Sequence, residues 1–294
     1  MSTQIPAEPL RPPGSGPHFP SPDMRSVADA LRHAGLERVD AQVLLARVLG
    51  NNRAWLSAHG GDELTSDQHA AFAALAERRR CGEPVAYLTG VREFHGLELR
   101  VTPAVLIPRP ETEVLVDWAL TRLPLDSRTR MLDLGSGSGA IALAVAHRRP
   151  WAQVLGVDAS AGALVVARDN ATRLGIGNVE WRLSDWYGAL AKMPAFDVIV
   201  SNPPYVRDDD PHLAQGDVRF EPAIALRGGA DGLSALREVV QGALARLRPG
   251  GALAVEHGYD QAADVRALLE TAGFAEVRSL RDLARTERVT CGIL

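Results

Sequence analysis

A short segment rich in proline, Asn202-Pro203-Pro204-Tyr205, directly follows the apolar run Phe196–Ser201. Two successive prolines continue neither a helix nor a central strand, and Pro203 restrains Asn202 to an extended backbone. The segment is therefore predicted to be a stiff turn at the carboxyl end of a buried strand, where open α/β sheets bind their ligands. An amide side chain beside backbone carbonyls suits the recognition of a planar NH2 group. An ordinary strand-to-loop turn is the alternative.

A glycine-rich turn supplies a second candidate site. The apolar run Met131–Leu134 is followed by Gly135-Ser136-Gly137-Ser138-Gly139 and by a helix start at Ala140. Glycines permit a tight turn and let a ligand approach the backbone. Roughly 20 residues later another strand ends at Asp158, whose carboxylate can accept hydrogen bonds from two ribose hydroxyls. The spacing also fits the dinucleotide fingerprint, so the glycines alone do not separate NAD from other nucleoside cofactors.

Three features favour S-adenosylmethionine over NAD. Asp133 precedes the turn, where negative charge suits a cationic ammonium and sulfonium but repels a pyrophosphate. A third strand ends in Asp185-Trp186, a pair expected to face the edge and ring of an adenine. The fourth strand ends at Asn202, which has no role in hydride transfer. A hydrogen-bonding role for Asp133 in the turn, and a core position for Trp186, remain as alternatives. The predicted cofactor contacts are Asp133, Gly135, Ser136, Gly137, Ser138, Gly139, Asp158, Asp185, Trp186 and Asn202.

The composition of the 294 residues excludes several classes of protein. Hydrophobic residues make up 46% and charged residues 23%, which is typical of a globular protein with a sizeable core. The net charge of −4 argues against a protein that binds by wrapping nucleic-acid phosphates. Cys81 and Cys291 lie far apart and form no metal-binding spacing. A cytoplasmic protein without a disulfide, a metal site or a membrane span is therefore expected.

The elements that position these motifs fall into four parts. Residues 1–23 are rich in Pro, Ser and Gly and are predicted to be a disordered tail, with Met24 as a possible translation start. Residues 24–85 show helical periodicity and form a small helical domain. Residues 86–105 are predicted to be a β-hairpin linker, because Gly90 and Gly96 mark turns and strand-like spacing is shown by Phe94, Leu97, Leu99 and Val101. Residues 106–294 form the last and largest domain.

Strands and helices alternate in the last domain, which predicts a doubly wound, Rossmann-like α/β sheet. The predicted strands are Arg130–Asp133, Gln153–Asp158, Val179–Leu183, Phe196–Ser201, Ala252–Glu256, Glu276–Leu280 and Arg288–Ile293. The predicted helices are Ala140–His147, Ala161–Leu174, Leu233–Leu247 and Gln261–Ala272. The connection Arg281–Thr286 is too short for a crossover helix, so the last strand is predicted to be antiparallel.

From about Met24 to Ile293 the chain resembles the release factor glutamine N5-methyltransferase family, a class I S-adenosylmethionine-dependent group. The linker and the stretch Arg219-Phe220-Glu221-Pro222 are its most specific parts. The matching motifs are Gly82-Glu83-Pro84, Tyr87-Leu88-Thr89-Gly90, Leu106-Ile107-Pro108-Arg109-Pro110-Glu111-Thr112-Glu113, Asp133–Gly139, Asp158, Ser184–Trp186, Ser201–Tyr205, Gly216–Pro222 and Glu256-His257-Gly258.

The resemblance implies a five-helix N-terminal domain that recognises the substrate, a hairpin linker and a catalytic domain. It implies methyl transfer to the side-chain amide nitrogen of the glutamine in the Gly-Gly-Gln loop of peptide chain release factors, which tunes translation termination. By matching position, Gly135–Gly139, Asp158 and Trp186 would bind S-adenosylmethionine, and Asn202–Tyr205 the glutamine. The Asn202 side-chain oxygen and the Pro203 carbonyl are expected to accept the two N–H groups, as the catalytic pair. Tyr205 would pack against the amide plane.

The main alternative function is amino methylation of adenine N6 or guanine N2 in nucleic acid, because the same chemistry serves any planar NH2. The acidic balance counts against it. A nucleoside-binding scaffold would not need Asn202. The expected partners are release factors, with no direct nucleic acid or membrane, and a monomer is expected. Arg109 and Glu111 either pair near the cofactor or fix the linker, and Arg219–Pro222 either shapes the substrate wall or packs as an ordinary loop.

Overall fold

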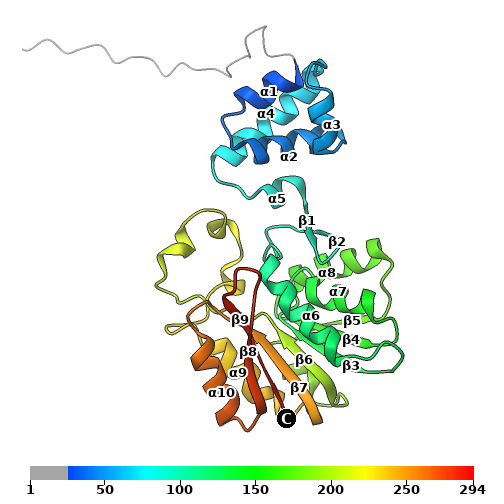
Figure 1. The fold of residues 1–294 in the computed structure, drawn as a ribbon, viewed down its shortest axis with the longest axis vertical. Coiled ribbons are helices and arrows are strands. Elements are labelled where there is room, and N and C mark those ends of the chain that lie inside the picture. Colours follow the sequence, from blue (N-terminus) through cyan, green and yellow to red (C-terminus); the bar gives the residue numbers. More distant parts are fainter. Residues whose placement is uncertain (1–25) are drawn as a thin grey trace, which may run out of the picture. The chain divides into compact units, whose positions relative to one another are not determined.

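The computed structural model describes residues 26–294, so the predicted tail, residues 1–23, and the proposed start at Met24 lie outside it. The described residues divide into two compact units, residues 26–80 and residues 81–294 (Figure 1). None of the helices within the described part of the chain is long and apolar enough to cross a membrane.

The first unit is helical, as its periodicity predicts. Its helices are α1 (Val27–His33), α2 (Arg38–Leu49), α3 (Arg53–Ala58) and α4 (Ser66–Arg80). Helix α4 begins with a reciprocal cap, in which Gln68 N donates to Thr65 Oγ1 at 3.2 Å and Thr65 N donates to Gln68 Oε1 at 2.9 Å. The core of this unit includes the buried side chains of Leu44 and Leu45 from α2 and of Phe72 from α4. The residues between Ser26 and Arg80 thus bury one apolar stripe from each of several short helices.

The second unit opens with a short helix and a hairpin. Helix α5 (Val85–Thr89) is followed by β1 (Val91–Phe94) and β2 (Leu97–Arg100), which pair antiparallel. The turn between the two strands, His95-Gly96, has φ values of 51° and 82°, as a tight primed turn requires. The prediction of a hairpin from residue 86 onward is therefore wrong for residues 86–89. They lie in α5, which Gly90 ends in the left-handed conformation with φ of 76°.

A seven-stranded sheet forms the centre of this unit, in the order β5-β4-β3-β6-β7-β9-β8. The strands are β3 (Arg130–Leu134), β4 (Gln153–Asp158), β5 (Val179–Leu183), β6 (Phe196–Ser201), β7 (Leu247–Glu256), β8 (Ala275–Arg281) and β9 (Glu287–Ile293). Five neighbouring strands are parallel, namely β5, β4, β3, β6 and β7, whereas β9 runs antiparallel to both β7 and β8. The predicted doubly wound sheet with an antiparallel last strand is confirmed.

Helices cover both faces of this sheet (Figure 1). They are α6 (Glu113–Arg122), α7 (Ala140–Arg148), α8 (Ala161–Leu174), α9 (Ser234–Ala243) and α10 (Ala262–Thr271), with a 3-10 turn, η1 (Pro110–Thr112), before α6. Alternate residues of each strand enter opposite cores, because side chains in a strand alternate between faces. Met131 packs with α6 and α7, whereas Leu132 packs with α9 and α10. Both sides of the central strands are thus buried, as a parallel sheet requires.

The boundary between α9 and β7 also differs from the prediction. The sequence predicts a helix over Leu233–Leu247, but α9 ends at Ala243 and β7 already begins at Leu247. Gly250 and Gly251 resemble a break before the strand, yet they lie within it. The register shifts between Phe196 and Val198 of β6, so β7 accommodates the two glycines in an irregular stretch.

Candidate functional site

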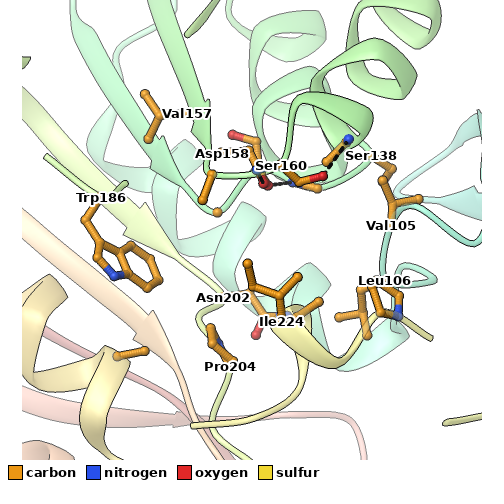
Figure 2. Close-up of a pocket in the computed structure, with 18 of the residues that line it drawn as sticks. Val105, Leu106, Ser138, Val157, Asp158, Ser160, Trp186, Asn202, Pro204 and Ile224 are labelled. Atoms are coloured by element: carbon orange, nitrogen blue, oxygen red, sulfur yellow. Dashed lines mark hydrogen bonds between the residues drawn. The ribbon is translucent and has the colours of Figure 1, made fainter. Parts of the chain in front are cut away.

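A cavity of about 370 Å³ lies at the carboxyl ends of β3, β4, β5 and β6. The sheet order reverses at this point, because the chain runs from β3 outward to β5 and then returns to the other side of β3 as β6. Figure 2 shows Asp158, Trp186 and Asn202 around this space, with Leu106 and Ile224 across from Trp186. The structure therefore brings together the candidate residues that the sequence places at four separate strand ends.

The glycine-rich turn and Asp158 form one wall. Gly135 and Gly137 have φ values of 72° and 55°, and a Cβ at Gly137 would have no atom within 4 Å. The Asp158 carboxylate accepts a hydrogen bond from Gly137 N at 2.8 Å and another from Ser160 N at 2.8 Å (Figure 2). Burial raises the pKa of Asp158, and these two backbone bonds act against the rise. Each oxygen retains a lone pair, so the carboxylate can still accept a ligand hydroxyl.

Trp186 lines the cavity from a strained backbone. Its φ of 40° lies in the left-handed region, which is costly for a residue with a side chain. Ser184 holds this turn, since its hydroxyl donates to Trp186 O at 2.8 Å and accepts from Ala189 N at 3.0 Å. Asp185 also lines the cavity and is exposed. The turn thus fixes a flat aromatic ring and a carboxylate at the end of β5.

Asn202 lines the cavity with its side-chain orientation fixed by Thr112. Asn202 Nδ2 donates to Thr112 Oγ1 at 3.2 Å, and Thr112 is 4% exposed. Among the residues that the structure describes, none donates a hydrogen bond to Asn202 Oδ1. Because the nitrogen is engaged by Thr112, the oxygen is the atom that remains available for a ligand.

A fully buried carboxyl group lies behind Asn202. Glu256, the last residue of β7, accepts a hydrogen bond from the Tyr205 hydroxyl at 3.2 Å. Burial raises the pKa of Glu256 to about 7, whereas the nearby hydroxyls of Thr112 and Tyr205 act to lower it. Burial and the adjacent Glu256 also raise the pKa of Tyr205, which keeps its hydroxyl protonated and able to donate. Sequence reasoning assigned no role to Glu256 beyond its motif.

Two loops distant in sequence are joined at the cavity by an ion pair. Arg109 donates to Glu221 Oε2 at 2.6 Å, and Ile107 N donates to the other oxygen of Glu221 at 3.3 Å. The Glu221 side chain is fully buried. The alternative in which Arg109 pairs with Glu111 is wrong, because its partner is Glu221, whereas the alternative in which Arg109 fixes the linker is consistent with this ion pair. Breaking such a pair leaves one buried charge uncompensated, at a cost of about 3–5 kcal/mol.

The prediction that Asp133 faces the cofactor is wrong. Asp133 is 0% exposed and lies beneath the turn, where Oδ2 accepts from Ala142 N at 3.2 Å and its carbonyl accepts from Ser136 Oγ at 3.0 Å. Burial also raises its pKa to about 7, which weakens the argument from negative charge. The position of Asp133 agrees with the alternative, in which it is a hydrogen-bonding residue of the turn.

Gly139, Pro203 and Tyr205 also do not line the cavity. Gly139 is buried, and a Cβ there would meet the Trp181 ring at 2.7 Å, so this glycine permits helix packing rather than cofactor contact. Pro203 is buried. The Tyr205 ring packs against the core under β7, and its hydroxyl contacts Glu256. The ring thus supports the turn from the core side, and the predicted packing of Tyr205 on a substrate amide stays a prediction.

Sequence reasoning missed the walls of the cavity that come from loops. These residues include Val105, Leu106, Thr112, Ile224, Arg227, Gly228 and Glu238. The motif around Pro108–Glu113 was the available signal, although no role followed from its spacing. Within residues 26–294, no group of three or more His, Cys, Asp or Glu side chains is placed to hold a metal ion.

Comparison with known proteins gives matches over most of the chain. Residues 24–90 match the PrmC N-terminal domain, and residues 112–229 match the methyltransferase small domain. The release factor glutamine methyltransferase of Bordetella pertussis is 52% identical over 271 residues, which cover 92% of this chain and 100% of that protein. The protein of the same name from Escherichia coli is 46% identical over 269 residues, which cover 92% and 96%.

A solved structure agrees with the fold. The methyltransferase from Pyrococcus furiosus aligns with a TM-score of 0.51 at 17% identity, over 67% of this chain and 89% of that one. At this identity the likeness supports the Rossmann-like architecture of the second unit.

Proposed function

The chain belongs to the release factor glutamine methyltransferase family, and from this we propose that it methylates the N5 nitrogen of the glutamine in the Gly-Gly-Gln loop of peptide chain release factors. It is an S-adenosylmethionine-dependent methyltransferase, as its domain matches indicate. The relatives share about half of its residues over nearly their whole length.

The cavity fits S-adenosylmethionine. An open backbone turn at Gly135–Gly137 admits a ligand, Asp158 can accept ribose hydroxyls, and Trp186 with Asp185 can hold the adenine. The bound cofactor supplies an electrophilic methyl group on a sulfonium. The residues of this chain would hold it by the backbone of the turn and by these three side chains, with Asp133 shaping the turn from below.

The substrate nitrogen needs positioning more than activation by a base. An amide nitrogen is a weak nucleophile, because its lone pair is delocalised into the carbonyl. We propose that Asn202 Oδ1 and the Pro203 carbonyl accept its two N–H groups and direct the nitrogen toward the methyl group. As the N–C bond forms, the nitrogen gains positive charge, and the two oxygens bind it more strongly than in the ground state. The nitrogen then loses a proton to solvent.

The observation that carries this proposal is the fixed orientation of the Asn202 amide. Thr112 holds Nδ2, which leaves Oδ1 as an acceptor at the end of β6, beside the glycine turn. Gly135 and Asn202 approach closely, since a Cβ at Gly135 would lie 4.0 Å from the Asn202 carbonyl. An acceptor for an N–H group is thus placed next to the cofactor cavity.

We further propose that the protein acts as a monomer in the cytoplasm, that residues 24–85 recognise the release factor, and that residues 106–294 carry the chemistry. The function is tested by incubating the protein with labelled S-adenosylmethionine and a release factor. A release factor whose loop glutamine is replaced by alanine is the control. Equal label in both factors, or label in a nucleic acid in place of the factor, contradicts the proposal.

A further inference from the structure

Asn170 is an unusual residue for the middle of a helix. It lies within α8 and is 0% exposed, although asparagine favours turns and caps over helix interiors. A buried amide group is costly unless its hydrogen bonds are satisfied, so its partners indicate its role. Helix propensity does not explain this residue, and its contacts with other segments must.

The side chain of Asn170 bonds to the backbone of two segments that are distant in sequence. Nδ2 donates to Ser138 O at 3.0 Å and to Arg100 O at 3.0 Å, and Oδ1 accepts from Arg100 N at 2.7 Å. Exchanging the oxygen and nitrogen of this amide would place the oxygen against two carbonyl groups, so the bonds fix a single orientation. One buried side chain therefore joins the glycine-rich turn to the end of β2.

On the cofactor side, the bond supports a part of the turn that the following helix does not. Ser138 lines the cavity and precedes Gly139, the N-cap of α7, so its carbonyl lies outside the hydrogen bonds of that helix. Gly137 and Gly139 on either side of it have φ values of 55° and 83°. Because glycines have many other conformations available, a backbone held open to a ligand gains from an external anchor. Asn170 supplies one.

On the other side, the bonds fix the linker where it approaches the cavity. Arg100 ends β2, and Val105 lines the cavity shortly after it. Val105 shares a buried cluster with Ala163 and Val166 of α8, and its carbonyl accepts a hydrogen bond from the Tyr87 hydroxyl at 2.7 Å. The wall that the linker contributes to the cavity thus packs on α8, with Asn170 as a buried polar contact.

We propose that Asn170 is a positioning residue of the cofactor site, which holds the glycine-rich turn open and couples it to the packing of the linker on α8. Without it the turn populates several conformations, and the affinity for S-adenosylmethionine falls in proportion to the binding-competent fraction. By linkage, bound cofactor also stabilises the bonds between Asn170 and Arg100, although Arg100 does not line the cavity. The inference concerns cofactor binding and does not depend on which amide the protein methylates.

The first test measures the affinity for S-adenosylmethionine in Asn170→Ala by calorimetry, well below the unfolding temperature. We expect the dissociation constant to rise about 10-fold, which corresponds to a binding-competent fraction of about one tenth. At saturating cofactor, kcat with a release factor should stay within about twofold, because the bound cofactor restores the turn. An unchanged dissociation constant in the folded variant overturns the inference. If the wild type does not methylate the release factor, the proposed function fails, whereas calorimetry still decides this inference.

Asn178→Ala is the matched control. The Asn178 side chain donates through Nδ2 to the carbonyl groups of Ala146, Arg149 and Ala152 at 3.2, 3.0 and 3.1 Å. It precedes β5, at the amino end of the sheet, and does not line the cofactor cavity. This variant also removes the contacts of one asparagine with the backbone, so we expect a similar loss of unfolding free energy in urea, with the cofactor affinity unchanged within about twofold. An equal loss of affinity in both variants points to general destabilisation and refutes the positioning role.

A third readout uses the wild type and stays valid if Asn170→Ala does not fold. Hydrogen exchange followed by NMR reports the opening of the bond from Arg100 N to Asn170 Oδ1. Saturating S-adenosylmethionine should slow this exchange about fivefold or more, because it stabilises the turn that the same amide group holds. The Thr286 N–H is the control, since it also donates to a side-chain oxygen, Asp282 Oδ1 at 2.9 Å, in the turn between β8 and β9. Exchange at Arg100 that does not respond to the cofactor, or that slows equally at Thr286, overturns the inference.

Discussion

Gly228 packs directly against the turn that holds Asn202. The backbone around it is bonded to the segment after Tyr205, with Val206 N donating to Leu226 O at 2.9 Å and Gly228 N donating to Val206 O at 2.8 Å. A Cβ at Gly228 would lie 2.8 Å from Pro204 O, 2.8 Å from the Tyr205 Cα and 2.8 Å from Gly232 O. All three are backbone atoms, so no flexible side chain can move aside. Gly228→Ala must therefore displace the turn itself.

The size of the effect follows from these contacts. Relieving them to 3.4 Å, the lower edge of ordinary contact, needs a shift of about 0.6 Å. Overpacking of this kind costs about 1–3 kcal/mol of unfolding free energy. A misplacement of about 1 Å at a reacting centre costs about 100-fold in rate, so we expect kcat to fall at least about 10-fold.

The assay compares Gly228→Ala with Gly177→Ala. A Cβ at Gly177 has no atom within 4 Å and its φ is not left-handed, so this control introduces a methyl group without a clash. Methylation of a release factor gives kcat, calorimetry gives the affinity for S-adenosylmethionine, and urea denaturation gives stability. A folded Gly228→Ala protein with the kcat of Gly177→Ala would refute the reasoning, because the turn would then tolerate displacement.

Three further predictions follow from the site. Asn202→Ala should lower kcat about 100-fold with unchanged affinity for S-adenosylmethionine, and near-normal single-turnover rates would contradict its role. Asp158→Ala should weaken that affinity about 10-fold or more, because both the ribose acceptor and the bond to Gly137 N are lost; calorimetry measures it. Burial raises the pKa of Asp133 to about 7, so its contribution to stability is present below about pH 4 and lost as pH rises through about 7. The unfolding free energy of the wild type, measured in urea, should therefore fall relative to that of Asp133→Asn over this pH range, by on the order of a few kcal/mol. A difference between the two proteins that does not change with pH would contradict the raised pKa.

The bounds of the strands and the direction of the last strand were predictable because their signals are local. Apolar runs that end in glycine, proline or acidic residues give β3 to β6 nearly to the residue, and the short connection before Glu287 gives the antiparallel end. Asp133 directly precedes the glycine-rich turn, which predicts contact with the cofactor. The sequence alone does not reveal which face of the turn its side chain occupies.

The rest of the site depends on contacts between distant segments. Arg109 and Glu221 are 112 positions apart, and nothing in either segment's periodicity indicates that they meet. Thr112 lies 90 positions from Asn202 and reads in the sequence as the start of a helix. Such residues are selected by three-dimensional packing, so a periodic pattern does not identify them.

The hydrogen bond between Asn202 and Thr112 also matters for release factors whose loop glutamine has been chemically altered. Glutamine side chains in exposed loops can deamidate to glutamate, which replaces the NH2 group by a second oxygen. With Nδ2 held away, Asn202 can offer only an oxygen to that carboxylate. Two facing oxygens repel and leave buried polar atoms unpaired, which sites of this kind reject strongly. A deamidated loop has no amide nitrogen to methylate, and this repulsion would also keep it from occupying the site in place of an intact loop.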